Sequence, residues 1–348
     1  MKILCIGPLW RGSNAGGLFK AFGRQGCLIE VVDEFYYLSL QQEQSLPLKI
    51  CTKILRPWQI QSFNLAILSK FSLVKPDILL VYKGAFIKST TLIRIKQRGA
   101  KLVNFYPDVS MFSHGKLLPQ TMPLFDLVFT TKTFGKEDLR NAFGVENSVF
   151  IPHGFDPEIH RLIPGFNDLK QKYVCDVSFI GTWSPKKEAL LAKLKTSLPG
   201  IELKIWGNQW HKSKEENLKK SIQHNEVLGD LYALAIQSST INLGILSERV
   251  RGASSGDRIT SRTFHIPGSG GFLLHERNAE SVQYYQENKE AAFFETPEEL
   301  ADKVQYYLNN PEKREAIRLA GYKRALADHS LDSRAKTVLA HLHNLLKV

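Results

Sequence analysis

Residues 257–276, DRITSRTFHIPGSGGFLLHE, carry the strongest indication of chemistry in the chain. The segment predicts a short helix that begins at Thr260 or Ser261, a pair of glycines that ends it, and a buried strand. A hydroxyl side chain at a helix start accepts a hydrogen bond from a free backbone N–H, and glycine tolerates the conformation that ends a helix. Free N–H groups beside the guanidinium groups of Arg258 and Arg262 favour a phosphorylated ligand. The alternative is an ordinary solvated basic helix.

Residues 176–188, DVSFIGTWSPKKE, predict a second contact with such a ligand. A strand is expected to end at Gly181, and a proline-started helix follows. Gly181 and Thr182 are expected to face a diphosphate, and Lys186 or Lys187 to pair with it. A capped helix with solvated lysines is the alternative.

The first half of the chain offers weaker candidates. Residues 12–17, GSNAGG, form a glycine-rich turn in which Gly16 and Gly17 are candidate ligand contacts. The turn lacks the spaced glycines of a dinucleotide site and the Lys-Ser/Thr ending of a P-loop, so a structural role is an equal alternative. Asp108 and His114 are candidates for a general base facing an acceptor hydroxyl. A turn cap and an exposed loop residue are the plainer interpretations of these two.

Alternating strand and helix patterns must position these residues. The apolar runs predict strands at residues 3–7, 28–32, 78–82, 102–106 and 127–131, and again at 176–181, 201–206, 240–246, 271–274 and 291–294. Helical patterns lie between them. The alternation favours two α/β domains with parallel sheets, at 1–150 and 151–330, and a final helix within 331–348 that returns to the first domain. The crossing at 151–157, IPHGFDP, is rich in proline and glycine. We expect the working site in a central cleft that the two Rossmann-like domains face.

Composition limits the partners. The net charge is +12, and residues 1–150 contribute +9 of it. This excess favours an acidic partner such as an anionic membrane surface or a phosphorylated acceptor, whereas no nucleic-acid module pattern occurs. The basic and apolar residues of 49–75 fit a helix lying on an anionic membrane, although core-facing helices give the same pattern. Four cysteines without metal spacing and no apolar run of about 18 residues favour a reduced, cytoplasmic protein, at most peripheral on the inner membrane face.

The second half resembles glycosyltransferases of the GT-B fold, and in particular the CgeB-like (spore-maturation-type) group. The resemblance rests on segments FIGTW (179–183), TSRTF (260–264) after Asp257, PGSGGFLL (267–274) and FF with PEEL (293–300), and on the linker IPHGFD. It is specific over about 150–340 and weak before that.

The resemblance implies roles for individual residues. Related retaining enzymes carry an acidic residue near the donor sugar, then seven residues, then a glutamate that binds the nucleotide ribose. Asp257 fills the first position and His265 stands at the second. A histidine offers one nitrogen to a ribose hydroxyl where glutamate offers two oxygens. The implied donor-binding set is Gly16, Gly17, Gly181, Thr182, Lys187, Thr260, Ser261, Arg262, Thr263 and His265.

The predicted activity is transfer of a sugar, hexosyl-like, from a nucleotide-diphosphate donor to a hydroxyl of a glycan, lipid-linked or protein acceptor. No cofactor and no metal are expected, because no cluster of carboxylates or histidines has ligand spacing. The Asp257 pattern hints at retention of configuration, and the sequence leaves inversion open. The alternatives are a nucleotide-sugar epimerase of the same architecture and a non-catalytic nucleotide- or sugar-binding protein.

Overall fold

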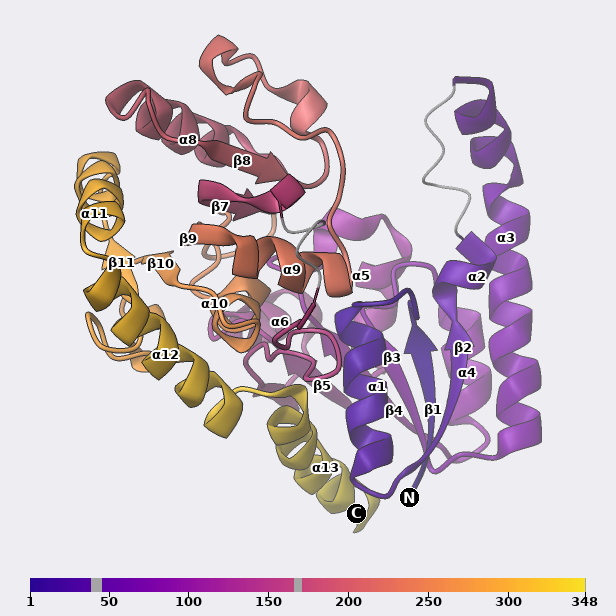
Figure 1. Cartoon of the computed structure of the whole chain (residues 1–348). Coiled ribbons are helices and arrows are strands. Elements are labelled where there is room, and N and C mark those ends of the chain that lie inside the picture. The colour runs from indigo at the N-terminus through magenta and orange to yellow at the C-terminus, as the bar shows by residue number, and fades with distance from the viewer. Residues whose placement is uncertain (39–45, 166–170, 348) are drawn as a thin grey trace. The chain divides into compact units, whose positions relative to one another are not determined.

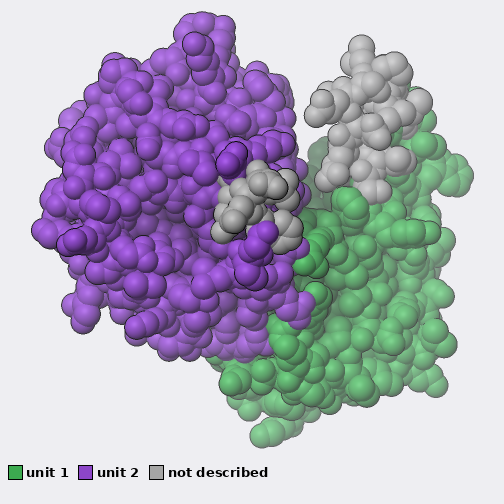
Figure 2. Space-filling view, in the orientation of Figure 1, with its two compact units in different colours: residues 1–152, 249–255, 334–348 green, residues 153–248, 256–333 purple. Residues whose placement is uncertain are grey.

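The computed structural model describes residues 1–38, 46–165 and 171–347. They form two compact units (Figure 2). Unit 1 comprises Met1–Pro152, Arg249–Ser255 and Arg334–Val348, and unit 2 comprises His153–Glu248 and Gly256–Ser333. The chain therefore enters unit 2 after Pro152 and ends in unit 1.

Unit 1 contains a sheet of six parallel strands in the order β2-β1-β3-β4-β5-β6 (Figure 1). The strands are β1 (Lys2–Gly7), β2 (Leu28–Asp33), β3 (Ile78–Tyr82), β4 (Lys101–Tyr106), β5 (Leu127–Thr130) and β6 (Ser148–Phe150). The chain passes from β1 to β2 on one side and then to β3 on the other. Ligands of parallel sheets bind at the carboxyl ends of the strands that flank such a reversal, so the loops after β1 and β3 are the places to look for function.

Helices cover both faces of this sheet, which is why all five residues of β3 are buried. Their bounds are α1 (Asn14–Arg24), α2 (Glu34–Leu38), α3 (Leu46–Val74), α4 (Ser89–Lys96), α5 (Leu117–Thr121), α6 (Gly135–Phe143) and α13 (Leu331–Lys347), with short 3₁₀ turns η2 (Met111–His114) and η3 (Met122–Leu124). One core layer joins alternate strand residues such as Leu79 and Val81 to Phe63 and Ile67 of α3. On the other face α13 reaches the sheet, where His341 lies edge-on to Phe129.

Unit 2 contains a sheet of five parallel strands in the order β11-β10-β9-β7-β8. The strands are β7 (Cys175–Ile180), β8 (Leu203–Trp206), β9 (Ser239–Gly244), β10 (Leu273–Glu276) and β11 (Ala292–Phe294). This sheet reverses between β7 and β9. The carboxyl ends of these two strands therefore mark the expected ligand side of unit 2.

The helices of unit 2 begin at residues suited to a helix start. Ser184 and Thr296 accept hydrogen bonds from backbone N–H groups in the first turns of α8 and α11, and each is followed by a proline. The bounds are α8 (Pro185–Ser197), α9 (Asp230–Ser238), α10 (Ser261–Gly268), α11 (Pro297–Asn309) and α12 (Pro311–Asp328), with 3₁₀ turns η4 (Trp210–Lys212), η5 (Glu216–Leu218) and η6 (Ser281–Gln283). Helices α8 and α11 contribute Leu191 and Leu300 to the main core of the unit.

The predicted architecture of parallel sheets with covering helices is confirmed, and every predicted strand overlaps an observed one. Strand β6 was missed because it has only three residues at a sheet edge. All of the segment 49–75 except Lys75 lies within one continuous helix, α3, which contains Pro57. Among the helices of the described residues, none is long and apolar enough to cross a membrane.

Candidate functional site

Arg262 joins the carboxyl ends of the two strands that flank the reversal in unit 2. It lies in the first turn of α10, and its Nη2 donates to the carbonyl of Ile245 at 2.7 Å, just after β9. Its Nη1 lies 3.5 Å from the carbonyl oxygen of Ile180, the last residue of β7. Its Nε is buried without a hydrogen-bond partner. Arg262 is thus held in place by the protein and retains an unused donor.

Lys187 is a second cation at the same place, and it is buried. Its side chain is in α8, the residue is 4% exposed, and its Nζ donates to the Thr182 carbonyl at 3.2 Å and to Ser247 Oγ at 3.1 Å. Burial, and then the charge of Arg262, lower the pKa of Lys187 to about 8. Burial also lowers the pKa of Arg262. Both shifts mean that the charged forms would be stabilised by an added anion.

Gly181 allows this arrangement. A Cβ at position 181 would lie 2.7 Å from Arg262 Nη1 and 2.9 Å from the ring of Phe179. The Arg262 guanidinium lies over the same ring, 5.2 Å from its centroid. Thr182 is exposed, and its carbonyl holds Lys187. Any larger residue at 181 would displace the guanidinium.

Asp257 lies in the segment before α10, where its backbone N–H donates to the Ser247 carbonyl at 2.9 Å. Its charge acts on Lys187 and on Arg262, raising the pKa of each. The structure therefore brings Asp257, Lys187, Arg262 and Gly181 into one cluster. Ser247, which the sequence did not single out, joins this cluster by accepting from Lys187 and pairing with the backbone of Asp257.

The hydroxyl residues at the start of α10 bind to the protein itself. Thr260 is the N-cap residue, and its backbone N–H donates to Thr263 Oγ1 at 3.1 Å. Thr263 Oγ1 also lies 2.8 Å from His275 Nε2. Ser261 Oγ lies 3.3 Å from His153 Nδ1. These contacts fix the helix start, and Arg262 keeps its unused Nε donor.

His265 lies in a buried group of imidazole rings within unit 2. Its ring stacks on His160 with centroids 3.8 Å apart, and its Nε2 lies 3.2 Å from the Gly154 carbonyl oxygen. Tyr232 packs edge-on against both rings. Burial, and then the nearby rings of His160 and His153, hold the pKa of His265 well below its usual value. The ring is therefore neutral at pH 7, and nothing in the sequence indicated the stack.

This group predicts a loss of stability in acid. Burial lowers the pKa of His160 to about 3 and that of His275 to about 4, and it lowers that of His265 as well. Protons therefore bind the unfolded chain first, and stability should fall as pH drops below the unfolded value of about 6.5. Each group contributes roughly 1.4 kcal/mol per pH unit down to its folded pKa. Urea unfolding followed at pH 7.5 and 5.5 measures the loss.

The control for this prediction is the exposed His211. His265→Gln should reduce the slope of stability against pH, whereas His211→Gln should leave it unchanged. Equal slopes in wild type and His265→Gln would show that folding does not lower the pKa of this imidazole.

In unit 1, Asp108 and His114 meet at the carboxyl end of the sheet. Asp108 Oδ2 lies 2.8 Å from His114 Nε2 and 2.8 Å from Lys83 Nζ. Burial would raise the pKa of Asp108, but the His114 hydrogen bond and the Lys83 charge hold it well below its usual range. Such a carboxylate is a weak base. The pair therefore serves better to hold the Lys83 ammonium than to remove a proton.

The candidates Gly16 and Gly17 lie in the first turn of α1, in unit 1. Their N–H groups donate to Ser13, at 3.0 Å to Oγ and 3.0 Å to the carbonyl oxygen. The other donor-binding candidates belong to unit 2.

Sequence reasoning missed two residues at the carboxyl ends of strands. Glu276 ends β10, and its carboxylate pairs with Lys186 at 2.5 Å and accepts from the Leu246 N–H at 2.9 Å. Glu34 directly follows β2, and burial raises its pKa to about 7. The signal that would have found both is simple: each is an acidic residue at the end of an apolar run.

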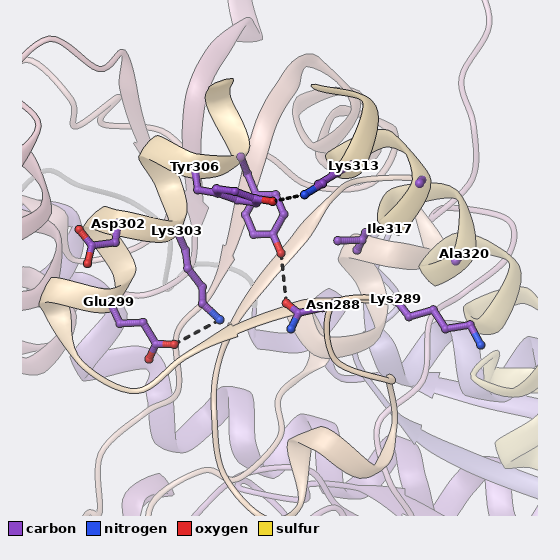
Figure 3. Close-up of a pocket in the computed structure, with 11 residues that line it drawn as sticks. Asn288, Lys289, Glu299, Asp302, Lys303, Tyr306, Lys313, Ile317 and Ala320 are labelled. Carbon is purple, nitrogen blue, oxygen red and sulfur yellow. Dashed lines mark hydrogen bonds and ion pairs between the residues drawn. The ribbon is translucent and has the colours of Figure 1, made fainter. Parts of the chain in front are cut away.

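A pocket of about 920 Å³ lies elsewhere in unit 2, against α11 and α12 (Figure 3). Two of its lysines contact neighbours that also line the pocket. Lys303 Nζ lies 3.2 Å from Glu299, and Lys313 Nζ donates to the Tyr306 hydroxyl at 2.7 Å. The lining has three lysines against two carboxylates, and the pocket does not contain the predicted site residues. Over residues 1–38, 46–165 and 171–347, no group of three or more histidine, cysteine or acidic residues is arranged to hold a metal ion.

A comparison with protein families matches the second half of the chain. Residues 186–340 match the family model described as glycosyl transferase-like. A search of curated proteins found no match.

Solved structures are similar over the full length of the chain. Sucrose-phosphate synthase from Thermosynechococcus elongatus has a TM-score of 0.70 at 11% identity, covering 100% of this chain and 99% of that one. Anabaena HepE in complex with UDP-glucose has a TM-score of 0.65 at 13% identity, covering 99% and 100%. UDP-GlcNAc 2-epimerase from Neisseria meningitidis, bound to UDP-GlcNAc, has a TM-score of 0.51 at 12% identity, covering 99% and 100%. The chain therefore has the two-sheet α/β fold of GT-B glycosyltransferase structures, and its residues 186–340 are similar to the glycosyl transferase-like family.

Proposed function

We propose that this protein is a GT-B glycosyltransferase, of the CgeB-like group, that transfers a sugar from a nucleotide-diphosphate donor to an acceptor hydroxyl. Unit 2 binds the donor and unit 1 binds the acceptor. The reaction needs no metal and no cofactor, because fixed cations stabilise the departing diphosphate. The transferred sugar is a hexose and keeps its configuration.

One observation carries this proposal: the buried Lys187 and the half-buried Arg262 are two neighbouring cations at the reversal of the unit 2 sheet. Each has a lowered pKa, and Arg262 has an unused Nε donor. A diphosphate placed there would gain charge-assisted hydrogen bonds and relieve the repulsion between the two cations. Asp257 is the nearby carboxylate that would face the donor sugar.

A thermal-shift screen across nucleoside diphosphates, with EDTA present, tests this donor site. Binding stabilises the folded protein by about 2.7 kcal/mol at a ligand concentration of 100 Kd. We expect at least one nucleoside diphosphate to raise the melting temperature in EDTA. If shifts occur only with added divalent cation, the metal-free proposal is wrong. If no nucleotide shifts the melting curve, the donor site is wrong.

Two alternatives, an epimerase and a non-catalytic binding protein, would each leave a different product from a nucleotide sugar. HepE was solved with UDP-glucose and the Neisseria epimerase with UDP-GlcNAc, so the fold itself is compatible with both chemistries. An epimerase would change the configuration of the nucleotide sugar without releasing the nucleoside diphosphate. A non-catalytic binding protein would bind the nucleotide sugar and leave it intact.

The acceptor side includes a surface suited to an anionic membrane. Helix α3 exposes apolar side chains on the same side, with Ile54 67% and Trp58 76% exposed. Lys53 is exposed beside them, and residues 1–150 carry a net charge of +9. We propose that this face of α3 lies on the inner face of the cytoplasmic membrane, because basic residues next to exposed apolar ones bind anionic lipid.

Removing the Trp58 ring should weaken this binding. Trp58→Ala should lower affinity for vesicles containing anionic lipid by on the order of 1 kcal/mol, since it removes apolar area from the lipid contact. The matched control is Leu73→Ala, because Leu73 is also exposed on α3 but lies at the C-terminal end of the helix. Liposome flotation at low and high salt measures the effect, because the charge term fades over a Debye length of about 8 Å at physiological salt. Equal recovery of wild type with neutral and anionic vesicles would contradict the proposal.

A further inference from the structure

A second cluster of polar groups lies in unit 1, around the loops that follow β2 and β3. Lys83 directly follows β3, one of the strands flanking the reversal of this sheet, and it has a φ of 67°. A non-glycine residue in this left-handed region is strained, and such strain is found at ligand sites. The strained turn presents the Lys83 ammonium to Asp108 at 2.8 Å. Glu34 follows β2, and its charge interacts with Lys83 and with Arg56 of α3.

Several buried polar atoms of this region have no hydrogen-bond partner. They are Glu34 Oε2, Arg56 Nη1, Gln59 Oε1 and Asn104 Oδ1. Buried polar groups are almost always hydrogen-bonded, so unpaired ones indicate a missing ligand or water. Three of these atoms accept and one donates. A ligand that satisfies them must both donate and accept, which is the property of a hydroxyl group.

The Arg56 side chain is held ready for such a ligand. Its guanidinium lies over the ring of Phe86, 4.5 Å from the centroid. The backbone beside Phe86 is fixed in turn by Asn64, whose Nδ2 donates to the Phe86 carbonyl at 2.9 Å. Asn104 is fully buried, and its Nδ2 donates to the Lys83 carbonyl at 3.1 Å.

Carboxylates outnumber cations here, in contrast with the donor cluster of unit 2. The carboxylates of Asp33, Glu34 and Asp108 stand against the cations of Arg56 and Lys83, with His114 beside Asp108. The excess positive charge of residues 1–150 is therefore not concentrated at this cluster. An anionic group would meet the carboxylates, whereas a neutral ligand with hydroxyls would not.

We propose that Glu34, Arg56, Gln59, Lys83 and Asn104 form a binding site for a neutral saccharide, in which Glu34 and Arg56 make the orienting hydrogen bonds. The inference rests on the proposed function, for which it names the acceptor class as a sugar hydroxyl. Glu34 is the residue that makes binding sensitive to pH. Burial is the largest effect and raises the pKa of Glu34. The charges of Lys83 and Arg56 lower this pKa, the charge of Asp33 raises it, and the resulting pKa is about 7.

Saturation-transfer NMR with a panel of methyl glycosides tests this site without any donor. Wild type should show saturation of at least one glycoside, and Glu34→Ala should reduce it at least about fivefold. Glu34→Gln should retain binding and remove the change in binding between pH 6 and pH 8 that wild type shows. Glu30→Ala, exposed within β2 and paired with Lys70 on the surface, is the control and should behave like wild type.

The outcomes separate this inference from the proposed function. Glycerol phosphate is the anionic probe, and its binding in place of every glycoside would overturn the inference. Absence of glycoside saturation in wild type, or equal saturation in Glu34→Ala, would also overturn it. Nucleoside diphosphate affinity, measured in the same variants, should not change. If glycosides bind and no nucleotide does, the proposed function fails while this site stands.

Discussion

Arg262→Ala should weaken binding of a nucleoside diphosphate by about 1.5–3 kcal/mol, which is roughly 10- to 150-fold in Kd. The residue is positioned by two strand-end carbonyls, at 2.7 Å and 3.5 Å, so its guanidinium is already in place before the ligand arrives. A charged donor that needs no reorganisation contributes its full hydrogen bond to the bound state. Isothermal titration calorimetry in EDTA measures the change.

The same two carbonyl contacts mean that Arg262 also stabilises unit 2. Thermal unfolding of the variant must therefore be measured beside its affinity. Arg262→Lys keeps the charge and loses the fork of donors, so its affinity should fall between those of wild type and Arg262→Ala. Arg324→Ala, on the surface of α12 and paired with Asp328, is the control that should bind normally. A folded Arg262→Ala protein with unchanged affinity would leave the residue a purely structural link between β7 and β9.

Asp257→Asn should lower sugar transfer at least about tenfold, or about 1.4 kcal/mol of barrier. The carboxylate lies in electrostatic range of Lys187 and Arg262, where the proposed function places the sugar end of a bound donor. There it would favour the positive charge that develops at the anomeric carbon in the transition state. Asparagine keeps the shape of the side chain and removes that charge.

Nucleotide binding should respond differently. Because Asp257 partly offsets the two cations, its removal should leave nucleoside diphosphate affinity unchanged or slightly improved. Comparing kcat with the calorimetric Kd separates the two effects. Asp302→Asn, on the exposed side of α11, is the matched control. If affinity and rate fall together, or if the variant loses stability, Asp257 serves the cation pair alone.

The sequence predicted the fold well, because both sheets consist of short apolar strands bounded by turn residues. It also predicted the start of α10 at Thr260 or Ser261 and the close approach at Gly181, since caps and close backbone approaches leave local signals. It did not predict β6, whose three residues carry too little pattern. Nor did it reveal the stack of His265 on His160, because residues 105 positions apart meet only through tertiary packing.

The site residues divide in the same way. Lys187 stands out in sequence because it follows a predicted strand that ends at Gly181. Arg262 stands out because it lies at a predicted helix start. Glu34, Arg56 and Gln59 do not, since they come from a strand end and from a long helix that packs beside it. Their importance depends on burial and on unpaired atoms, which only coordinates reveal. Asp108 illustrates the reverse, because its predicted role as a base weakens once its contacts with Lys83 and His114 are known.

The most direct test of the central claim is chromatographic detection of nucleoside diphosphate released from a panel of nucleotide sugars, with EDTA present. The proposed transfer predicts release from at least one of them, faster with a saccharide acceptor present, and strongly reduced in Asp257→Asn. Nucleotide sugars that come back intact, or with an inverted sugar carbon and no free nucleoside diphosphate, would contradict it.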